Sequence, residues 1–312
     1  MQETLSSSSE RLRGETMLKQ IYKLLGRAYP LYSGAGKIGN HSFARKLTLG
    51  IKSPTLTSLR RGPRIYVNLT DLDGRIVYFT GDSDRKVTWA VHEILRPGDC
   101  FLDIGANHGV VALYAAQFVG CTGQVHAFEP QPALASLIQR SAMVNGFEHL
   151  KIHPVALTDA ERSINLFIPR GHTGSASLSL ARRGSGDHVI TQGVQCSTYL
   201  THMSLPSIRL IKLDVEGHEE VVLRAGAEYF KNNPPDAFIT EMIRDELSFW
   251  DHPVPSQLLK LGYRLLEIPK ATVQMYLIEL IPGKAGPSKD CDIIAVRNKT
   301  LWNHLQAFCR LR

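Results

Sequence analysis

The chain has 312 residues, 43% of them hydrophobic, which is enough to bury the core of one large domain or two smaller ones. No window holds the roughly 18 consecutive apolar residues of a membrane span, and the N-terminal segment lacks the apolar core of a signal peptide. The five cysteines are scattered without metal-ligand spacing, so composition excludes a disulfide scaffold or zinc cluster and predicts a cytoplasmic protein with reduced thiols.

The formal net charge of +7 is concentrated at the N-terminus. Residues 1–64 hold 12 Lys and Arg against 3 Asp and Glu, and the rest of the chain is nearly neutral. We therefore predict a basic helical extension over residues 1–63 and a main domain over residues 64–312. Apolar residues in the extension share one helical face: Leu18, Ile21, Tyr22, Leu25 and Tyr29. A helix over 16–29 either packs this face on the domain or attaches weakly to an anionic membrane surface, peripheral to the membrane.

From residue 64 onward the hydrophobic pattern predicts an α/β domain. The stretch "RIYVNLTDLDGRIVYFTG", residues 64–81, alternates like two strands of a hairpin that turns at Asp73-Gly74. A helix over 84–95 follows. Strand and helix patterns then alternate along the chain: strand 100–104, helix 108–118, strand 124–128, helix 131–145 and strand 151–155. Such alternation predicts right-handed crossovers and a doubly wound, mostly parallel sheet with helices on both faces.

Residues 162–198 interrupt this rhythm, because they are rich in Gly and Ser and contain one alternating strand. They predict a long excursion at the edge of the sheet or over the site. The rhythm then resumes with a further series of elements: strand 208–213, helix 217–231, strand 236–242, helix 254–261, strand 262–267 and closing strands in 272–281 and 291–297. The segment Asn233-Pro234-Pro235 resembles a motif of base-methylating enzymes, but we interpret it as the end of a helix.

Polar side chains follow the ends of the predicted strands, where open α/β sheets bind their ligands. The first strand ends at Asp103 and runs into the glycine turn "DIGANHG", where backbone can approach a ligand closely. A carboxylate there would repel the pyrophosphate of a dinucleotide, so Asp103 favours S-adenosylmethionine over NAD. Glu129 ends the next strand and can accept both ribose hydroxyls of either cofactor.

A third polar group lies in "LIKLDVEGHEE", after the fourth strand. Lys212, Asp214 and Glu216 fall there within five positions, which is typical of a site that handles a sulfonium and a substrate hydroxyl. The alternative is an acidic turn that caps the following helix.

Four blocks together resemble the FkbM family of S-adenosylmethionine-dependent methyltransferases, over about residues 64–297: "FLDIGANHG", "GQVHAFEP", "HPVALTDAE" and "IKLDVEGHEEVVLRAGA". The resemblance implies a class I methyltransferase sheet of seven strands with the last one antiparallel. It also implies O-methylation of a hydroxyl on a sugar, glycolipid or natural product.

The resemblance implies a role for individual residues as well. Four would hold the methionine part of the cofactor: Asp103, Gly105, Asn107 and Gly109. Glu129 would bind the ribose, and Asp159 in "ALTD" would lie near the adenine. The methyl group and the acceptor would be faced by Lys212, Asp214 and Glu216. Glu241 would close the far wall of the acceptor site.

The group that receives the acceptor's proton is left open by the family pattern. Asp214 or Glu216 is the expected base, with His218 next because its unperturbed pKa lies nearer neutrality. An acidic cluster that also includes Glu241 would suit a metal-dependent enzyme, but we predict no bound metal. His108 is expected to line the pocket by its backbone.

Two other functions stay open at this point. The basic extension could contact phosphates in an RNA or DNA methyltransferase, or the chain could be a non-catalytic scaffold that kept the pocket. We expect a small-molecule, glycan or glycolipid acceptor and no nucleic acid. Three arginines in the 162–198 segment could clamp an acidic group of the acceptor or only solvate a loop: Arg170, Arg182 and Arg183. The sequence does not predict the oligomeric state.

Overall fold

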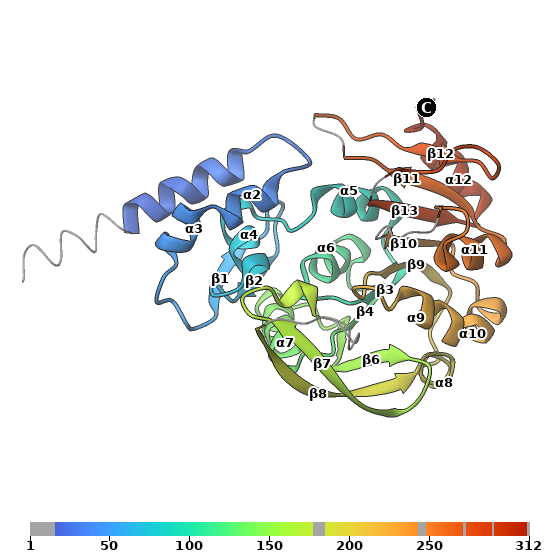
Figure 1. Cartoon of the computed structure of the whole chain (residues 1–312), viewed down its shortest axis with the longest axis horizontal. Coiled ribbons are helices and arrows are strands. Elements are labelled where there is room, and N and C mark those ends of the chain that lie inside the picture. The colour runs from blue at the N-terminus through green and yellow to red at the C-terminus, as the bar shows by residue number, and fades with distance from the viewer. Residues whose placement is uncertain (1–15, 177–184, 243–247, 271–272, 289, 311–312) are drawn as a thin grey trace, which may run out of the picture.

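The computed structural model describes residues 16–312 except 177–184, 243–247, 271–272, 289 and 311–312 (Figure 1). An eight-stranded sheet forms its centre. In spatial order its strands are β12 Ile278–Leu280, β11 Arg264–Ile268, β13 Cys291–Val296, β10 Ala237–Met242, β9 Ile208–Leu213, β3 Cys100–Ile104, β4 Gln124–Phe128 and β5 Leu150–His153.

The direction of the strands matches the prediction. The five strands from β10 to β5 are parallel, and β13 runs antiparallel between β10 and β11. The predicted mostly parallel sheet, with the last strand antiparallel, is therefore confirmed. The short edge strand β12 pairs antiparallel with β11 and brings the number from the expected seven to eight.

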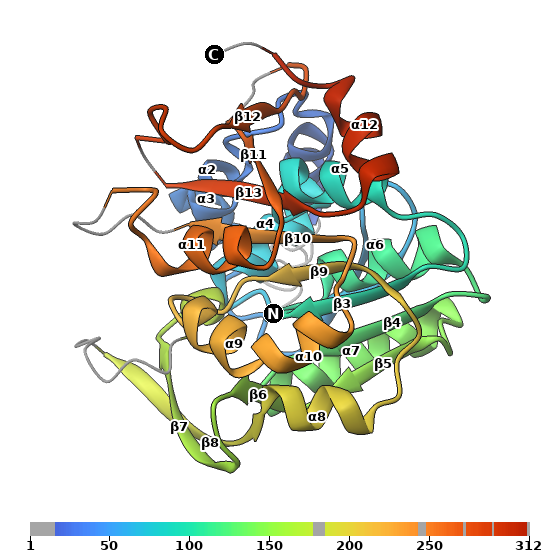
Figure 2. The ribbon, with the colours of Figure 1, turned by 90° about the vertical axis from the view of Figure 1, so that its right-hand side faces the viewer.

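Helices cover both faces of this sheet (Figure 2). One face carries α5 Arg85–Ile94, α6 Val110–Val119, α7 Pro132–Asn145 and α12 Lys299–Gln306. The other carries α8 Cys196–His202, α9 Glu219–Ala225, α10 Ala227–Asn232 and α11 Pro253–Lys260. Every residue of β3 is buried, as expected of a central parallel strand covered on both faces.

The helix predicted over 217–231 consists of two helices, α9 and α10, which meet at Gly226. A Cβ at Gly226 would lie 2.4 Å from the Phe230 ring, so glycine permits the close approach of α10. The helix α10 ends at Asn232, directly before Asn233-Pro234-Pro235. The interpretation of this segment as a helix end is confirmed.

A second, three-stranded sheet lies beside β5 and contains β6 Val155–Thr158, β8 Gly186–Gln195 and β7 Arg162–Pro169, in that order. The prediction of one strand within residues 162–198 is wrong, because β7 and β8 pair antiparallel along eight residues of each. A 3₁₀ turn, η1 Thr173–Ser175, follows β7.

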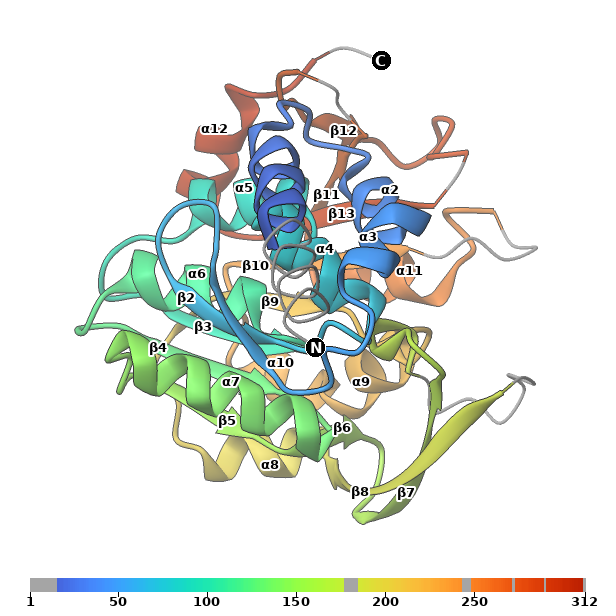
Figure 3. The same ribbon diagram turned by 90° about the vertical axis from the view of Figure 1, so that its left-hand side faces the viewer.

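The N-terminal part packs against the end of the domain that carries α5 and α6 (Figure 3). It contains a helix over 16–28, α2 Ala35–Asn40, α3 Ser42–Leu47, the antiparallel pair β1 Thr55–Ser58 and β2 Arg64–Val67, and α4 Leu72–Thr80. The boundary expected after residue 63 falls between the paired strands β1 and β2. Ala44 and Leu59 belong to the same hydrophobic core as Phe101 of β3, so the extension shares the core of the domain.

The hairpin predicted over residues 64–81 is wrong, since only its first half is a strand and the second half is α4. Asp71 caps this helix by accepting a hydrogen bond from the Gly74 backbone N–H at 3.0 Å. Seven of its nine residues are buried, so α4 lacks a polar face and its apolar run resembles a buried strand. A Cβ at Gly74 would lie 1.9 Å from the Asn68 carbonyl oxygen, which explains the glycine without a hairpin turn.

The helix over 16–28 does not place its whole apolar face on the domain. Its packing side is formed by Tyr22, whose ring meets Phe79 edge-on at 4.9 Å, and by Lys23, which lies 4.3 Å over the Tyr78 ring. Five large apolar side chains face solvent instead: Met17, Leu18, Ile21, Leu24 and Leu25. The prediction that the apolar face packs on the domain is therefore wrong for most of its residues. Among the described residues, no helix combines the length and apolarity needed to span a bilayer.

Candidate active site

Two cavities meet at the carboxyl edge of the central sheet. The first, the apolar cavity, measures about 60 Å³ and lies between the glycine turn, the end of β4, β6 and η1. The second, the acidic cavity, measures about 220 Å³ and extends toward α4, α5 and the ends of β10 and β13. Both cavities are lined by five common residues: Gly105, Asn107, Gly174, Asp214 and Glu216.

The glycine turn after β3 is held against the ends of the two neighbouring strands. Gly105 adopts φ +84°, and its N–H donates to the Phe128 carbonyl at 3.0 Å. A Cβ at Gly105 would lie 1.8 Å from the Asp214 carbonyl oxygen, so only glycine fits there. Gly109, at φ +81°, precedes α6, and a Cβ there would lie 2.9 Å from Ile138. The turn therefore presents backbone to the apolar cavity at close range.

Glu129 lies at the end of β4, where the sequence placed it, and lines the apolar cavity. Only 3% of its surface is exposed. Its two carboxylate oxygens accept backbone hydrogen bonds from Asn107 at 2.8 Å and Gln131 at 2.9 Å, which fixes their positions. Burial raises the pKa of Glu129 to about 7. The remaining lone pairs face a site that can offer hydroxyl donors.

Asp103 is placed differently from its expected role, because it is fully buried and is not among the residues lining either cavity. Its carboxylate forms an ion pair with the Lys212 ammonium, at 3.3 Å. Burial raises the pKa of Asp103, and the neighbouring lysine opposes that shift. Asp103 is thus connected to the acidic cavity through Lys212, which lines it.

Lys212 joins the glycine turn to the acids. Its ammonium donates to the Gly105 carbonyl at 3.0 Å and lies 3.2 Å from the Asp214 carboxylate. Burial alone would lower the pKa of Lys212, but Asp214 and Asp103 raise it above its usual value. Because the ammonium stays protonated, Lys212 cannot receive a proton from an acceptor. Its chemistry is that of a fixed positive charge beside two carboxylates.

Asp214, Glu216 and Glu241 form a carboxylate cluster at the junction of the cavities. Each offers an oxygen within 4.8 Å of the others. Asp214 and Glu216 line both cavities, while Glu241 lines the acidic cavity. Burial, reinforced by the charges of Asp214, Asp292 and Glu216, raises the pKa of Glu241 to about 8. A carboxyl group with such a pKa can exchange a proton near neutrality.

His218 and Asp159 lie on the side of the apolar cavity. His218 lines that cavity, and its Nε2 atom lies 3.0 Å from the Thr158 hydroxyl. Burial lowers the pKa of His218. Asp159 lines neither cavity, since its carboxylate pairs with Arg162 at 2.9 Å on the surface. On this side, where Asp159 was expected near the adenine, the apolar cavity is lined by apolar side chains instead: Ala156, Leu157 and Leu166.

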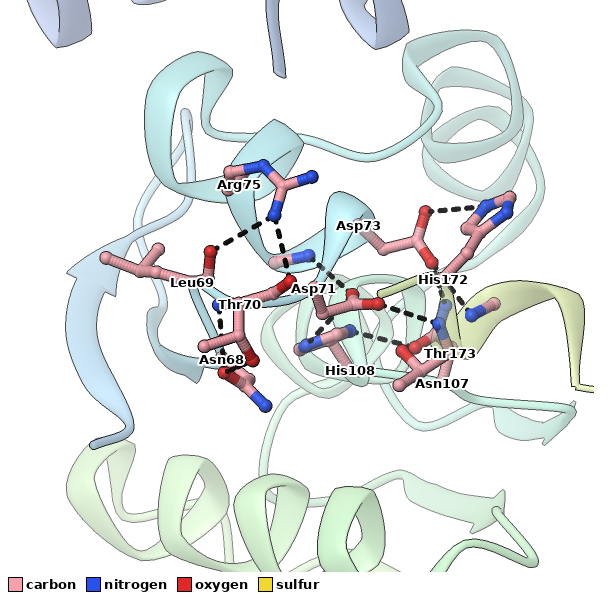
Figure 4. Close-up of polar contacts among 12 residues, drawn as sticks. Asn68, Leu69, Thr70, Asp71, Asp73, Arg75, Asn107, His108, His172 and Thr173 are labelled. Carbon is pink, nitrogen blue, oxygen red and sulfur yellow. Dashed lines mark hydrogen bonds and ion pairs between the residues drawn. The ribbon is translucent and has the colours of Figure 1, made fainter. Parts of the chain in front are cut away.

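Two acids at the start of α4 reach this site, and no local pattern in the sequence indicated their role (Figure 4). Asp71 accepts from the Thr173 N–H at 2.7 Å, and Asp73 accepts from the Gly174 N–H at 2.8 Å. Asp73 also accepts from the Asn107 side-chain amide at 3.4 Å. We call this pair, Asp71 and Asp73, the aspartate clamp. It ties η1 and the glycine turn to the start of α4, so α4 closes this side of the site.

The acidic cavity contains a further ion-pair group that no local sequence motif indicated. The Lys86 ammonium on α5 pairs with both Asp84 and Asp292. Burial raises the pKa of Asp292 to about 6, although Lys86 opposes the shift. Asp292 lies on β13, which is about 200 residues away in the sequence, and only the pairing of β13 with β10 brings it to the cavity. The sequence indicated Asp84 only as the first residue of the predicted helix over 84–95.

Other residues considered in the sequence analysis fall at different places. His108 is buried and lines the acidic cavity, and its Nδ1 atom lies 2.8 Å from the side-chain amide oxygen of Asn107. The segment Asn233-Pro234-Pro235 precedes β10 and so lies at the amino edge of the sheet, away from the site. Arg170 lines a separate cavity together with Arg45 and Arg75. Arg182 and Arg183 lie outside the described residues.

Comparison with known proteins identifies the family to which this chain is similar. Residues 103–265 match the family described as the methyltransferase FkbM domain. The 31-O-demethyl-FK506 methyltransferase FkbM of Streptomyces tacrolimicus is 29% identical over 167 residues, which cover 43% of this chain and 61% of that protein. The chain thus spans less than two thirds of the length of this relative.

Solved structures with a similar course of the chain are also methyltransferases. A SAM-dependent O-methyltransferase from Thermotoga maritima gives a TM-score of 0.40 at 14% identity, over 79% of each chain. The tRNA (uracil-54, C5)-methyltransferase of Pyrococcus abyssi, in complex with S-adenosyl-L-homocysteine, gives 0.41 at 11% identity, over 78% of this chain and 44% of that one. Likenesses of this size do not distinguish one acceptor from another.

Proposed function

This chain belongs to the methyltransferase FkbM domain family, and from that premise we propose that it methylates a hydroxyl oxygen of a sugar, glycolipid or natural product. It is an S-adenosylmethionine-dependent methyltransferase by family. The relative from Streptomyces tacrolimicus is named for methylation of an oxygen, which supports the oxygen as acceptor atom here.

The residues around the apolar cavity fit S-adenosylmethionine. Glu129 offers a buried carboxylate to the ribose, and Leu157, Leu166 and Val155 offer an apolar wall to the adenine. The glycine turn leaves backbone, rather than side chains, beside the methionine part. Asp103, Gly105, Asn107 and Gly109 would hold that part, with Asp103 acting through Lys212. When bound, the cofactor supplies a methyl group on a positively charged sulfur.

The carboxylate cluster supports the chemical step. In methyl transfer, the acceptor oxygen forms a bond to the methyl carbon, the carbon–sulfur bond breaks, and the hydroxyl proton must leave. Asp214 and Glu216 line both cavities, so they face the place where donor and acceptor would meet. Glu241, whose pKa is raised to about 8, is the group of the cluster that we propose as the acceptor of this proton.

Lys212 contributes a fixed positive charge to this step. It lies 3.2 Å from Asp214 and keeps that carboxylate close to the glycine turn. The same ammonium partly neutralises the cluster, so a divalent cation would compete with it for Asp214. We therefore propose a metal-independent reaction. His218 lines the cofactor side alone, which supports contact with the cofactor more than proton transfer from the acceptor.

The observation that carries the proposal is the position of Asp214 and Glu216 between an apolar cavity and an acidic one. Its first test is isothermal titration with S-adenosylmethionine and with NAD. We expect the first to bind, with binding lost in Glu129→Ala and retained in Glu228→Ala, which removes an exposed acid of α10. Binding of NAD alone, or unchanged affinity in Glu129→Ala, would contradict it.

The acceptor is then sought with labelled S-adenosylmethionine and a panel of glycans, glycolipids and polyketides. Turnover that survives EDTA agrees with the proposal, whereas turnover that requires Mg²⁺ would make the carboxylate cluster a metal site. Transfer of the labelled methyl group to nucleic acid would contradict the proposed hydroxyl acceptor and would favour an RNA or DNA methyltransferase. Absence of turnover with every acceptor, despite cofactor binding, would favour a scaffold.

A further inference from the structure

A third cavity lies apart from the two at the sheet edge. It measures about 110 Å³ and lies between residues 30–32, residues 60–61 and the outer sides of α5 and α6. No described residue lines both this cavity and either cavity of the methyl-transfer site. We call it the arginine pocket, after Arg60, Arg61 and Arg85 in its wall. Nothing in the proposed methyl transfer requires it.

Arg85 is a buried charged residue in the lining of the pocket. Only 6% of Arg85 is exposed, and its Nη1 atom donates to the carbonyls of Tyr29 and, at 2.8 Å, Leu31. Its Nε and Nη2 atoms are buried and have no hydrogen-bond partner among the residues that the structure describes. Buried charged donors without acceptors are unfavourable. The edge of a guanidinium that carries Nε and Nη2 matches the two oxygens of one carboxylate or phosphate group.

The remaining charges of the pocket are mostly positive. Arg61 is exposed at its rim, and Arg60 uses Nη1 to donate to the Tyr29 carbonyl at 3.0 Å. Asp82 is the one acid among the described residues of the wall. Its carboxylate already accepts from the Thr88 hydroxyl at 2.8 Å and from the Asp84 N–H at 3.1 Å. The pocket thus has a surplus of positive charge and donors that no internal acid satisfies.

The walls of the pocket are aromatic. Trp89 and Tyr32 line it together with Tyr114 and Phe118, whose rings stack at 6.0 Å. His92 meets Phe118 edge-on at 4.9 Å. Flat rings around a guanidinium favour a ligand with a flat apolar body and one anionic end. A free inorganic anion would leave these walls uncovered.

We propose that the arginine pocket binds a small aromatic oxyanion, a carboxylate or a phosphate monoester, whose two oxygens accept hydrogen bonds from Nε and Nη2 of Arg85. Arg61 closes the anionic end, and the aromatic walls enclose the ring. The helices α5 and α6 line both this pocket and the acidic cavity, so the ligand would bind on the far side of the elements that shape the acceptor site.

The test is isothermal titration of the full-length protein with sodium benzoate and, separately, sodium phenyl phosphate, at constant ionic strength. Benzyl alcohol and inorganic phosphate are the comparison ligands, since each keeps one half of the proposed chemistry. We expect benzoate or phenyl phosphate to bind saturably and more tightly than both, and the better of the two identifies the anion. Quenching of tryptophan fluorescence, lost in Trp89→Phe, would place the ligand.

Variants locate the anion. Arg85→Lys keeps a cation but lacks the planar fork, so affinity should fall about tenfold. Arg61→Ala should weaken binding by a smaller factor, and it changes an exposed residue whose loss leaves the fold intact. Lys260→Ala, which removes a positive charge at the exposed end of α11, should change nothing. The proposal is overturned if neither aromatic anion binds, if inorganic phosphate binds equally well, or if affinity is unchanged in both Arg85→Lys and Arg61→Ala. S-adenosylmethionine binding in the same samples is independent of all these outcomes.

Discussion

The carboxyl edge of the central sheet and the start of α4 both border the acidic cavity, but they hold their polar groups in different ways. At the sheet edge, Asp214 and Glu129 follow directly from buried strands whose register is fixed by their neighbours. At the start of α4, Asp71 and Asp73 are held by a helix cap and by hydrogen bonds to η1, about 100 residues later in the chain.

This difference separates two tasks. The strand ends place a carboxylate, a lysine and a glycine turn within hydrogen-bond distance of each other, which supplies the reacting groups. The aspartate clamp supplies a wall, because it positions Thr173 and Gly174 over the apolar cavity without adding a reacting group to the carboxylate cluster. Changes at the sheet edge should therefore abolish function, whereas changes in the clamp should only weaken it.

The largest effect is expected for Gly105→Ala. Its Cβ would lie 1.8 Å from the Asp214 carbonyl, and its φ of +84° disfavours any L side chain. The matched control is Gly146→Ala, since Gly146 has φ +68° but nothing within 4 Å of the added carbon. We expect Gly105→Ala to reduce S-adenosylmethionine affinity by roughly 100-fold or more, with the control close to wild type. Equal affinity in both variants would mean that the close approach at Gly105 is unimportant.

Glu241→Gln comes next and tests the proton acceptor. If Glu241 must be ionised, kcat should rise with pH up to about 8 in the wild type, where its pKa lies. The variant should lose this rise and about 10- to 100-fold in kcat, while S-adenosylmethionine affinity is retained. A variant with the wild-type pH profile would assign the proton to Asp214 or Glu216 instead.

The same substitution has a predictable effect on stability. The pKa of Glu241 is about 8 in the folded protein against 4.5 as a free side chain, so the folded state binds the proton more tightly. The contribution of this proton to stability is present below pH 4.5 and is lost as the pH rises through 8. Glu241→Gln should thus unfold at a higher temperature than wild type at pH 9, with little difference at pH 5.

The sheet edge could be predicted from sequence because each of its parts is local. Buried parallel strands such as "CFLDI" are short apolar runs, and the polar residue that follows each run marks its carboxyl end. The clamp could not be predicted in this way. The helix α4 is buried on nearly all sides, so its sequence lacks a helical period, and Asp73-Gly74 satisfies the pattern of a hairpin turn. The partners of Asp71 and Asp73 are distant in sequence, so no local pattern points to them.

Asp73→Ala should have a moderate effect. It leaves the Gly174 N–H without its acceptor at 2.8 Å and removes the acceptor of the Asn107 amide, so η1 loses one of the hydrogen bonds that anchor it. The free energy of unfolding should fall by about 1–2 kcal/mol and S-adenosylmethionine affinity by several fold. Asp73→Asn keeps one carbonyl acceptor and should lie between alanine and wild type. If Asp73→Ala abolished binding as fully as Gly105→Ala, the distinction between reacting edge and wall would be wrong.

The smallest effect is expected on the outer face of the helix over 16–28, where Leu24 and Leu25 are 69% and 64% exposed. An exposed apolar stripe favours weak binding to a membrane surface, but Lys23 and Arg27 are turned toward the domain and cannot strengthen it. We expect slight co-sedimentation with vesicles that contain phosphatidylserine, lost in a Leu24→Ser, Leu25→Ser double variant that retains cofactor affinity. Strong, salt-sensitive sedimentation would contradict this, because it would show that the exposed basic residues of the extension, such as Lys37, Arg45 and Lys46, act as an electrostatic anchor.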